Sequence, residues 1–305
     1  MDNLSTNHNI LKNLLEVRGE YKIDEPLKKY TWLKIGGPAD VMFFPEDIDD
    51  LQTFLRNKNP ELSVFIIGGG SNLLIKDKGI CGVVIKLQNK NFAKVHVEDN
   101  KIYCGAGMLN SALKKTIAEN GLGGLEFLCS IPGTMGGTLR TNAGCFGAEL
   151  SDVLLSAQVM DFKGNIFTAE NKDFNFAYRY SQFPEDWIVL ELCLRYEKAS
   201  SVEIKQKIDQ YDEYRFNHQP HGIYTAGSTF KNPRGYRAWE LIKNAGGNSF
   251  AVGGVKMSPQ HCNFLENDGT ATASDVEKLG DKIITAVEKQ TGIKLEWEIK
   301  IVGRK

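Results

Sequence analysis

The stretch Phe65-Ile-Ile-Gly-Gly-Gly-Ser-Asn-Leu-Leu-Ile75 places three glycines, a serine and an asparagine between two apolar runs. Short apolar runs on either side of turn residues predict two buried strands, Val64–Ile67 and Leu73–Ile75, joined by a loop. Consecutive glycines let neighbouring main-chain N–H groups turn toward one point, which suits phosphate oxygens. A tight strand connection that is merely rich in glycine explains the same letters equally well. This stretch alone leaves both interpretations open.

The segment after the glycines excludes one common dinucleotide fold. In a Rossmann turn a helix follows the glycines directly, because the pyrophosphate rests on its N-terminus. Here the polar turn Lys76–Gly79 and an apolar run at Val83–Ile85 predict a second strand instead. Leu73 also stands where the GxGxxG fingerprint has its third glycine. The sequence therefore argues against a Rossmann site.

A second cluster of glycines changes the balance between the two interpretations. Ile131-Pro-Gly-Thr-Met-Gly-Gly137 and Asn142-Ala-Gly-Cys-Phe-Gly147 again offer main chain without bulky side chains. Two such loops can hold two ends of one long cofactor. A pyrophosphate at residues 68–72 and a planar ring against residues 130–147 would suit a flavin dinucleotide.

Composition limits the kind of ligand. The chain has 305 residues, 42% of them hydrophobic, and 37 basic against 38 acidic residues give a net charge of −1. A balanced charge without a basic run disfavours nucleic acid or a membrane surface as partner and favours a small molecule. Six cysteines without CxxC pairs predict free thiols rather than disulfides or a zinc site, and no metal is expected. Residues 1–20 lack the features of a signal peptide, and no apolar run reaches the ~20 residues of a spanning helix, so we expect a cytoplasmic protein.

The remaining pattern mixes strands with helices, which predicts an α+β fold. We expect helices at 11–17, 45–57, 109–119, 201–215, 238–244 and 274–291. Further strands are expected at 41–44, 93–97, 101–104, 154–159, 188–196 and 294–302. Residues 215–220 (RFNHQP) have the composition of a linker.

Several motifs together resemble the UDP-N-acetylenolpyruvoylglucosamine reductase family, flavoenzymes of peptidoglycan precursor synthesis. The matching motifs are GGGSNLL (68–74), SIPGTMGGTLRTNAGCFG (130–147), YRYS (178–181), GSTFKNP (227–233), LIKNAG (241–246), SPQHCNF (258–264) and LEWEIKIVG (295–303). They follow the family order over nearly the whole chain. The tyrosine-bearing insertion of one branch, between YRYS and the serine motif, is lacking, so the chain resembles the shorter branch.

The resemblance implies a reaction in two halves. NADPH first reduces a non-covalently bound FAD by hydride transfer. The reduced flavin then passes a hydride to the enolpyruvyl double bond of UDP-N-acetylglucosamine enolpyruvate, and an enzyme acid protonates the neighbouring carbon to give UDP-N-acetylmuramate. The flavin carries the hydride chemistry, while the protein orients the reactants, stabilises charge and supplies one proton.

Three residues match the catalytic positions of the family. The guanidinium of Arg179 can bind carboxylate oxygens in pairs and stabilise an enolate-like intermediate. Ser228 matches the proton-donating serine, which gives the proton itself or through a water that it orients. Glu298 matches the C-terminal glutamate, which could hydrogen-bond the intermediate or orient the acid. Residue type alone would make Arg179 a surface ion pair, Ser228 a turn residue and Glu298 an exposed carboxylate. Glu298 is preferred to Glu296 by the motif, because alternation along a strand would put both on one side.

The resemblance also implies the binding residues and the domains. The FAD contacts are expected at Gly68, Gly69, Gly70, Ser71, Asn72, Leu73, Ser130, Ile131, Pro132, Gly133, Thr134, Gly136, Gly137, Asn142, Ala143, Gly144 and Gly147. Tyr178, Lys231 and Asn232 are expected to contact the substrate. The fold implied is the two-part FAD-binding region of the PCMH/vanillyl-alcohol-oxidase type: residues 1–88 with a returning C-terminal strand at 292–305, residues 89–200, and a smaller α+β substrate-binding domain at 201–291. A monomer is expected.

Two other functions remain open at this level. An oxidase of the same architecture could tether its flavin through His or Cys; no histidine lies in either glycine loop, but Cys129 and Cys145 flank them. We interpret both thiols as small packing groups and His261 as structural. A silent nucleotide-binding protein is the other alternative, and the presence of Arg179 with Ser228 and Glu298 argues against it. Ser130 and Arg140–Thr141 depart from the family pattern, which bears on which loop atoms touch the flavin.

Overall fold

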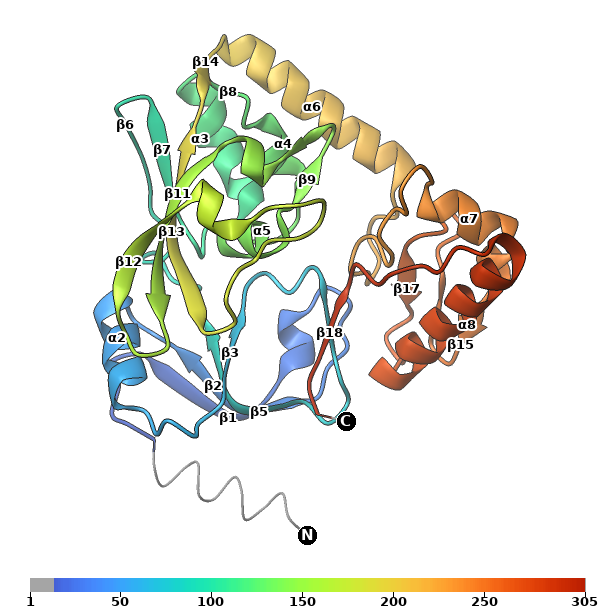
Figure 1. Ribbon diagram of the computed structural model, residues 1–305, viewed down its shortest axis with the longest axis horizontal. Helices are drawn as coiled ribbons and strands as arrows, with labels where there is room; N and C mark the ends of the chain where they lie inside the picture. The colour runs from blue at the N-terminus through green and yellow to red at the C-terminus, as the bar shows by residue number, and fades with distance from the viewer. Residues whose placement is uncertain (1–13, 305) are drawn as a thin grey trace. The chain divides into compact units, whose positions relative to one another are not determined.

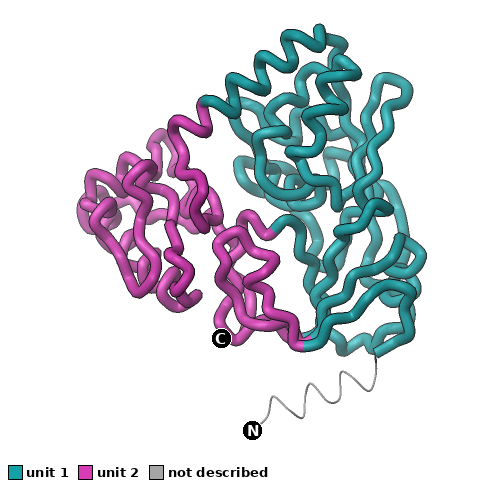
Figure 2. The backbone as a smooth tube through the Cα atoms, turned by 180° about the vertical axis from the view of Figure 1, so that it is seen from behind, with its two compact units in different colours: residues 1–23, 41–69, 82–213 teal, residues 24–40, 70–81, 214–305 magenta. Residues whose placement is uncertain are grey.

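The computed structural model describes residues 14–304, which form two compact units (Figures 1 and 2). Among the described residues, unit 1 comprises 14–23, 41–69 and 82–213, and unit 2 comprises 24–40, 70–81 and 214–304. Each unit has its own core of buried apolar side chains. The three-part division implied by the resemblance stays a prediction.

Unit 1 contains two sheets. In the first the strand order is β1-β2-β5-β3, and β3 and β5 are parallel. In the second the order is β12-β11-β13-β7-β6, and its neighbouring strands are antiparallel. The strands are β1 (Glu20–Pro26), β2 (Pro38–Phe44), β3 (Val64–Ile67), β5 (Ile80–Lys86), β6 (Val95–Glu98), β7 (Lys101–Gly105), β11 (Leu154–Asp161), β12 (Ile166–Glu170) and β13 (Trp187–Arg195). The ends of β1, β2 and β5 run into unit 2.

Helices and short elements complete unit 1. The helices are α2 (Ile48–Asn57), α3 (Leu113–Glu119), α4 (Glu126–Ser130), α5 (Met135–Thr141) and α6 (Ser201–His218), with 3-10 turns η2 (Asn110–Ala112), η3 (Leu150–Asp152) and η4 (Asn171–Phe174). Two small ribbons pair β8 (Leu122–Gly123) with β14 (Glu197–Lys198) and β9 (Gly144–Cys145) with β10 (Ala148–Glu149).

Unit 2 packs two helices with short strands. Its elements are η1 (Leu27–Tyr30), β4 (Leu73–Ile75), α7 (Ala238–Asn244), η5 (Gly247–Ser249), β15 (Ala251–Val252), β16 (Val255–Met257), β17 (Leu265–Asn267), α8 (Ala273–Thr291) and β18 (Lys300–Val302). A Thr272–Asp275 capping box begins α8 and Gly292, in the left-handed region, ends it. β18 pairs in parallel with β4, so the tail lies against the strand that follows the first glycine loop.

Several sequence predictions of elements are confirmed and others need correction. Strands follow the first glycine loop and α7 has the expected bounds. The helix expected at Pro45 begins only at Ile48, because the Asp47 carboxylate caps it by accepting a hydrogen bond from Asp50 N. Of the helix expected at 11–17, residues 11–13 lie outside the described range and residues 14–17 are not helical.

The other corrections concern longer segments. Residues 215–218 of the expected linker continue α6, which crosses the unit boundary after Glu213. The second glycine cluster is not only loop, because residues 135–141 form α5. The expected strand 294–302 is regular only from Lys300 to Val302.

Candidate active site

The glycines at 68–70 lie where main chain meets other parts of the protein closely. A Cβ atom at Gly69 would lie 2.6 Å from the Cα of Gly133, so the two glycine clusters touch main chain to main chain within unit 1. A Cβ at Gly70 would lie 1.9 Å from the carbonyl oxygen of Tyr30, and its φ of +65° favours glycine as well. The tight-connection interpretation therefore holds for these two glycines.

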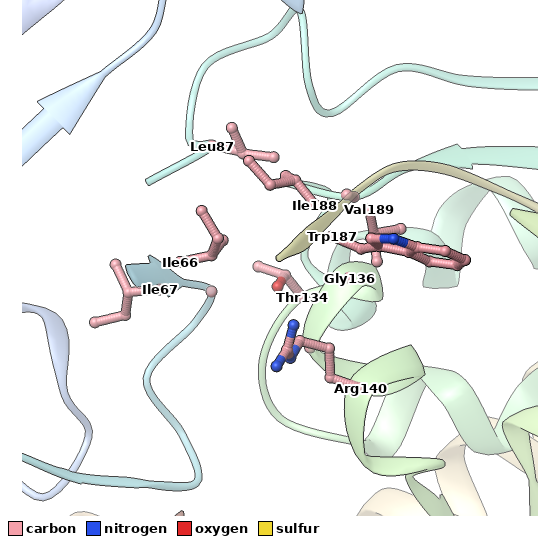
Figure 3. A pocket seen from close by; sticks show the side chains of 12 residues that line it. Ile66, Ile67, Leu87, Thr134, Gly136, Arg140, Trp187, Ile188 and Val189 are labelled. Atoms are coloured by element: carbon pink, nitrogen blue, oxygen red, sulfur yellow. The ribbon is translucent and has the colours of Figure 1, made fainter. Parts of the chain in front are cut away.

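Both glycine clusters also line one pocket of unit 1 (Figure 3). The empty space between its walls, open solvent included, is about 430 Å³. Bare main chain contributes at Gly68, Gly136 and Gly137, next to the Thr134 side chain. The other lining residues are Ile66, Ile67, Leu87, Ala106, Arg140, Trp187, Ile188 and Val189. An apolar wall beside exposed main chain suits a ligand with a flat ring and phosphates.

The second glycine cluster contains one polar side chain without a hydrogen-bond partner and one that bonds to the protein main chain. Ser130 has a buried hydroxyl oxygen that finds no hydrogen-bond partner within residues 14–304. Asn142 is fully buried in the left-handed conformation; its amide donates to the Ala177 carbonyl at 3.1 Å and accepts from Ser151 N at 3.0 Å. A Cβ at Gly144 would lie 2.4 Å from the Ala148 carbonyl oxygen, whereas one at Gly147 would meet nothing within 4 Å. The unpartnered hydroxyl and the bare main chain fit a polar ligand, and Asn142 serves the protein itself.

Arg179 lies in a tight turn on unit 1. Ala177 and Tyr180 exchange two main-chain hydrogen bonds of 3.0 Å across the turn. Arg179 has a φ of +54°, which is rare for a residue with a side chain and costs about 1–2 kcal/mol. Its Nη2 donates to the Gly144 carbonyl at 2.8 Å, and its guanidinium lies 5.0 Å from the Tyr178 ring. This backbone strain at an arginine next to the second glycine cluster is typical of a functional position.

Ser228 and Glu298 come together within unit 2. Glu298 N donates to the Thr229 carbonyl at 2.8 Å, and Lys231 N donates to the Glu296 carbonyl at 2.9 Å, so the two segments run side by side. On the other side, Ser228 forms an isolated bridge with Phe264. The serine segment is therefore fixed from both sides, with the glutamate segment as one neighbour.

Two buried contacts hold this arrangement. The Asn263 amide accepts from Phe230 N at 3.0 Å and donates to the Phe230 carbonyl at 2.8 Å. It thus satisfies the two main-chain groups that a neighbouring strand would otherwise pair with. Trp297 packs on the Phe230 ring, with centroids 5.0 Å apart, and fills the space left by Gly280 in α8. Neither contact was predicted, because each depends on residues far apart in the sequence.

The expected substrate residues have local partners. Lys231 Nζ pairs with the Glu296 carboxylate at 3.6 Å, and Asn232 Oδ1 accepts from Ala238 N at 2.9 Å at the start of α7. Tyr178 is 47% exposed, so its ring is available to a ligand. Glu296 is exposed and Glu298 is half-buried, a difference that alternation alone did not predict.

A covalently tethered flavin would need a reactive thiol at Cys129 or Cys145, and a role in acid–base chemistry would need an accessible imidazole at His261. Burial raises the pKa of the Cys129 thiol to about 12, and Cys145 Sγ donates to the Phe127 carbonyl at 3.3 Å. Burial lowers the pKa of His261, whose Nδ1 accepts from Asn263 N at 3.2 Å. These contacts are structural in kind. Within the described part of the chain no group of three His, Cys, Asp or Glu residues could hold a metal ion, and no helix is long and apolar enough to cross a membrane.

Two basic residues close to the glycine clusters, Lys86 and Arg140, were not predicted as site residues. Lys86, on β5, donates from Nζ to the Gly68 carbonyl at 2.6 Å, and burial lowers its pKa. Arg140 lines the pocket from α5. The run Val83–Ile85 before Lys86 is buried without alternation, so no periodic signal indicated Lys86, and the position of Arg140 depends on the helix at 135–141.

Comparison with known proteins identifies the class and then the family. Residues 39–170 match the model of an FAD binding domain, and residues 219–302 match the model of the UDP-N-acetylenolpyruvoylglucosamine reductase C-terminal domain. The fold and the pocket thus define an α+β, FAD-dependent oxidoreductase.

Full-length relatives narrow this class to one family. The UDP-N-acetylenolpyruvoylglucosamine reductase of Rickettsia peacockii (strain Rustic) is 43% identical over 288 residues, 94% of this chain and 97% of the relative. That of Paramagnetospirillum magneticum is 42% identical over 290 residues, 95% and 94% of the two chains. The crystal structure of the Thermus caldophilus enzyme matches with a TM-score of 0.80 at 33% identity, covering 94% of this chain and 99% of that one. The chain belongs to the UDP-N-acetylenolpyruvoylglucosamine reductase family, which works in peptidoglycan precursor synthesis.

Proposed function

We propose that this protein reduces UDP-N-acetylglucosamine enolpyruvate to UDP-N-acetylmuramate in the cytoplasm, as a monomer, with NADPH as electron donor. FAD, when bound, supplies the hydride chemistry between the two substrates. The main chain at Gly68, Gly136 and Gly137 would hold the cofactor, which the pocket fits by its bare main chain and apolar wall.

The protein's own residues carry the rest of the reaction in this proposal. Ser228 donates the proton to the carbon next to the carboxylate, and Glu298 orients or supports that acid. Arg179 binds the substrate carboxylate and stabilises the negative charge that develops there. Tyr178, Lys231 and Asn232 contact the sugar nucleotide.

One observation carries the assignment of the proton donor. The hydrogen bond of 2.8 Å from Glu298 N to the Thr229 carbonyl puts the segment of Glu298 directly beside that of Ser228. These are the two residues that the family motifs select, and they lie far apart in the last sequence segment of unit 2, which begins at Tyr214. The buried Thr229 hydroxyl, which has no hydrogen-bond partner in the described chain, adds an unused polar group at the same place.

An anaerobic colour experiment tests the proposed reaction. The purified protein should be yellow, lose its colour with NADPH, and regain it when the enolpyruvyl sugar nucleotide is added. Bleaching without recovery would refute the substrate. A folded protein that takes up no FAD would refute the cofactor site.

A further inference from the structure

Arg140 differs from every other residue of the flavin pocket in its charge. Among the described residues that line this pocket, Arg140 alone carries one, and the rest are apolar, glycine or threonine. Figure 3 shows its side chain extending from α5 toward Thr134. The pocket therefore has one cation and bare main chain to offer an anionic ligand.

The helix geometry explains this direction. Arg140 lies one turn after Gly136 on α5, so both share a face of the helix. Side chains on a helix point back toward its N-terminus, which here means toward the main chain of Gly136 and Gly137. The guanidinium thus lies along the glycine surface that the sequence predicts for the cofactor.

The guanidinium lacks a counterion in the protein. It packs on Phe183, with Cζ 4.9 Å from the ring centroid, but within residues 14–304 it makes no side-chain hydrogen bond and no ion pair. Glu185 acts on it only through longer-range electrostatics, and desolvation lowers the pKa of Arg140. Arg140 is exposed to solvent, and no side chain of the described residues uses its five N–H donors, so they are available to an anionic ligand that enters the pocket.

We propose that Arg140 binds the diphosphate of FAD and supplies a positive charge next to the main chain of Gly136 and Gly137. The fork of a guanidinium matches two phosphate oxygens, whereas main-chain N–H groups offer hydrogen bonds without a full charge. This rests on FAD as the cofactor and on the predicted role of the glycine segments. It adds a binding residue at a position where the chain departs from the family pattern.

The test measures the release of FAD from the holoenzyme after dilution, followed by the rise in flavin fluorescence. Loss of a charge-assisted contact costs affinity mainly through faster dissociation. Arg140→Gln should release FAD about tenfold to a hundredfold faster, and Arg140→Lys should fall between it and the parent. Added salt should speed release from the parent protein more than from Arg140→Gln.

The flavin midpoint potential decides where the cation lies. It should not change in Arg140→Gln if the contact is at the diphosphate, because the ring then keeps its surroundings. Arg56→Gln is the control: its guanidinium donates to the Gly164 carbonyl at 3.3 Å and does not line the pocket, so release should match the parent.

The outcomes separate this proposal from its rivals. Unchanged release of FAD from Arg140→Gln would overturn it. A lower potential with unchanged release would place the cation at the flavin ring instead. If Arg140→Gln does not fold, Arg140→Lys serves as the test. Release of FAD from Arg140→Lys at the same rate as from the parent protein, at all salt concentrations, would also refute the proposal.

Discussion

The side-chain amide of Asn72 donates a hydrogen bond of 3.1 Å to the main-chain carbonyl of Glu298. The Asn72 carbonyl in turn accepts from Lys300 N at 3.0 Å. The last polar residue of the first glycine loop therefore holds the segment that carries the predicted glutamate. One amide links a loop expected to bind the cofactor with a residue expected to support the proton donor.

This link predicts that Asn72 and Glu298 act as a unit. Asn72→Ala and Glu298→Gln should each slow reoxidation of the reduced flavin by the sugar nucleotide. The double variant should be much less impaired than the product of the two effects, with a coupling of about 0.5–3 kcal/mol. Rapid-mixing measurements of flavin absorbance give each rate.

A second double-mutant cycle, between Asn72→Ala and Glu296→Gln, is the control. Glu296 lies on the same segment as Glu298, and its carboxylate is exposed. The effect of Glu296→Gln should combine with that of Asn72→Ala independently. Independence of Asn72 and Glu298 themselves, with only the FAD affinity altered in Asn72→Ala, would confine Asn72 to the cofactor.

Ser228→Ala should separate the two halves of the reaction. Reduction of the flavin by NADPH should stay within about twofold of the parent, because no proton donor to carbon is needed there. Reoxidation by the sugar nucleotide should slow by about 10²–10⁴-fold, the usual contribution of a general acid.

Ser249→Ala is the control for Ser228→Ala, as that hydroxyl is exposed and donates only to the Gly246 carbonyl at 2.8 Å. It should leave both rates unchanged. An equal loss in both halves for Ser228→Ala would make Ser228 part of the scaffold rather than the acid.

The turn at Arg179 predicts an unusual order of stabilities. Both Arg179→Ala and Arg179→Gly remove the guanidinium, so both should lose turnover. Only alanine keeps the penalty of the left-handed conformation, so the glycine variant should be about 1 kcal/mol more stable. Urea unfolding of the two variants measures the difference.

Tyr178 gives the comparison, because its φ is not positive. There alanine should be at least as stable as glycine. The same order at both positions would show that the strain at Arg179 does not exist in solution.

The environment of the thiols predicts a flavin that is not covalently bound. Because burial raises the pKa of Cys129 to about 12, its thiol stays protonated at neutral pH, and the thiolate is the nucleophile. Acid precipitation should therefore leave all the flavin in the supernatant. In the folded protein, iodoacetamide should modify exposed Cys81 well before Cys129. A yellow pellet would mean a tether, and Cys145→Ser would then show whether Cys145 provides it.

Local patterns predicted the strands and most helices, but not how the site is assembled. Apolar runs at 64–67 and 73–75 gave the strand–loop–strand unit with its true bounds, because burial and turn residues are both local properties. The helix at 135–141 was missed, since its glycine pair hides it. Thr138 is fixed there by a 2.7 Å hydrogen bond from Asn110 Nδ2, a contact that the sequence does not reveal. Without that helix, the direction of Arg140 could not be predicted.

The C-terminal segment, residues 294–302, is a second place where the local sequence pattern did not predict the tertiary contacts. A regular strand at 294–302 would put Glu296 and Glu298 on one side, but the main chain of this segment bonds to Thr229 and Lys231 before it reaches β4. Glu296 is exposed and Glu298 is half-buried in this irregular segment. Family motifs selected Glu298 because they retain tertiary information that periodicity lacks.

Substitution by alanine at Gly69 and at Gly137 should change the free energy of unfolding in opposite directions. At Gly69 an added Cβ would lie 2.6 Å from Gly133 Cα, so Gly69→Ala should lower the free energy of unfolding by about 1–3 kcal/mol. At Gly137 it would meet only Thr134 Oγ1, at 3.6 Å, an ordinary contact. Gly137→Ala should therefore stabilise the apoprotein by about 0.5–1 kcal/mol, as alanine does inside a helix.

The same methyl group at position 137 should weaken FAD binding, since Gly137 lines the pocket. We expect the dissociation constant for FAD, measured by flavin fluorescence, to rise about tenfold or more. Chemical unfolding of the FAD-free proteins supplies the stabilities. If Gly137→Ala binds FAD as tightly as the parent does, the main chain of α5 does not contact the cofactor, and glycine at 137 serves some purpose other than leaving space for it.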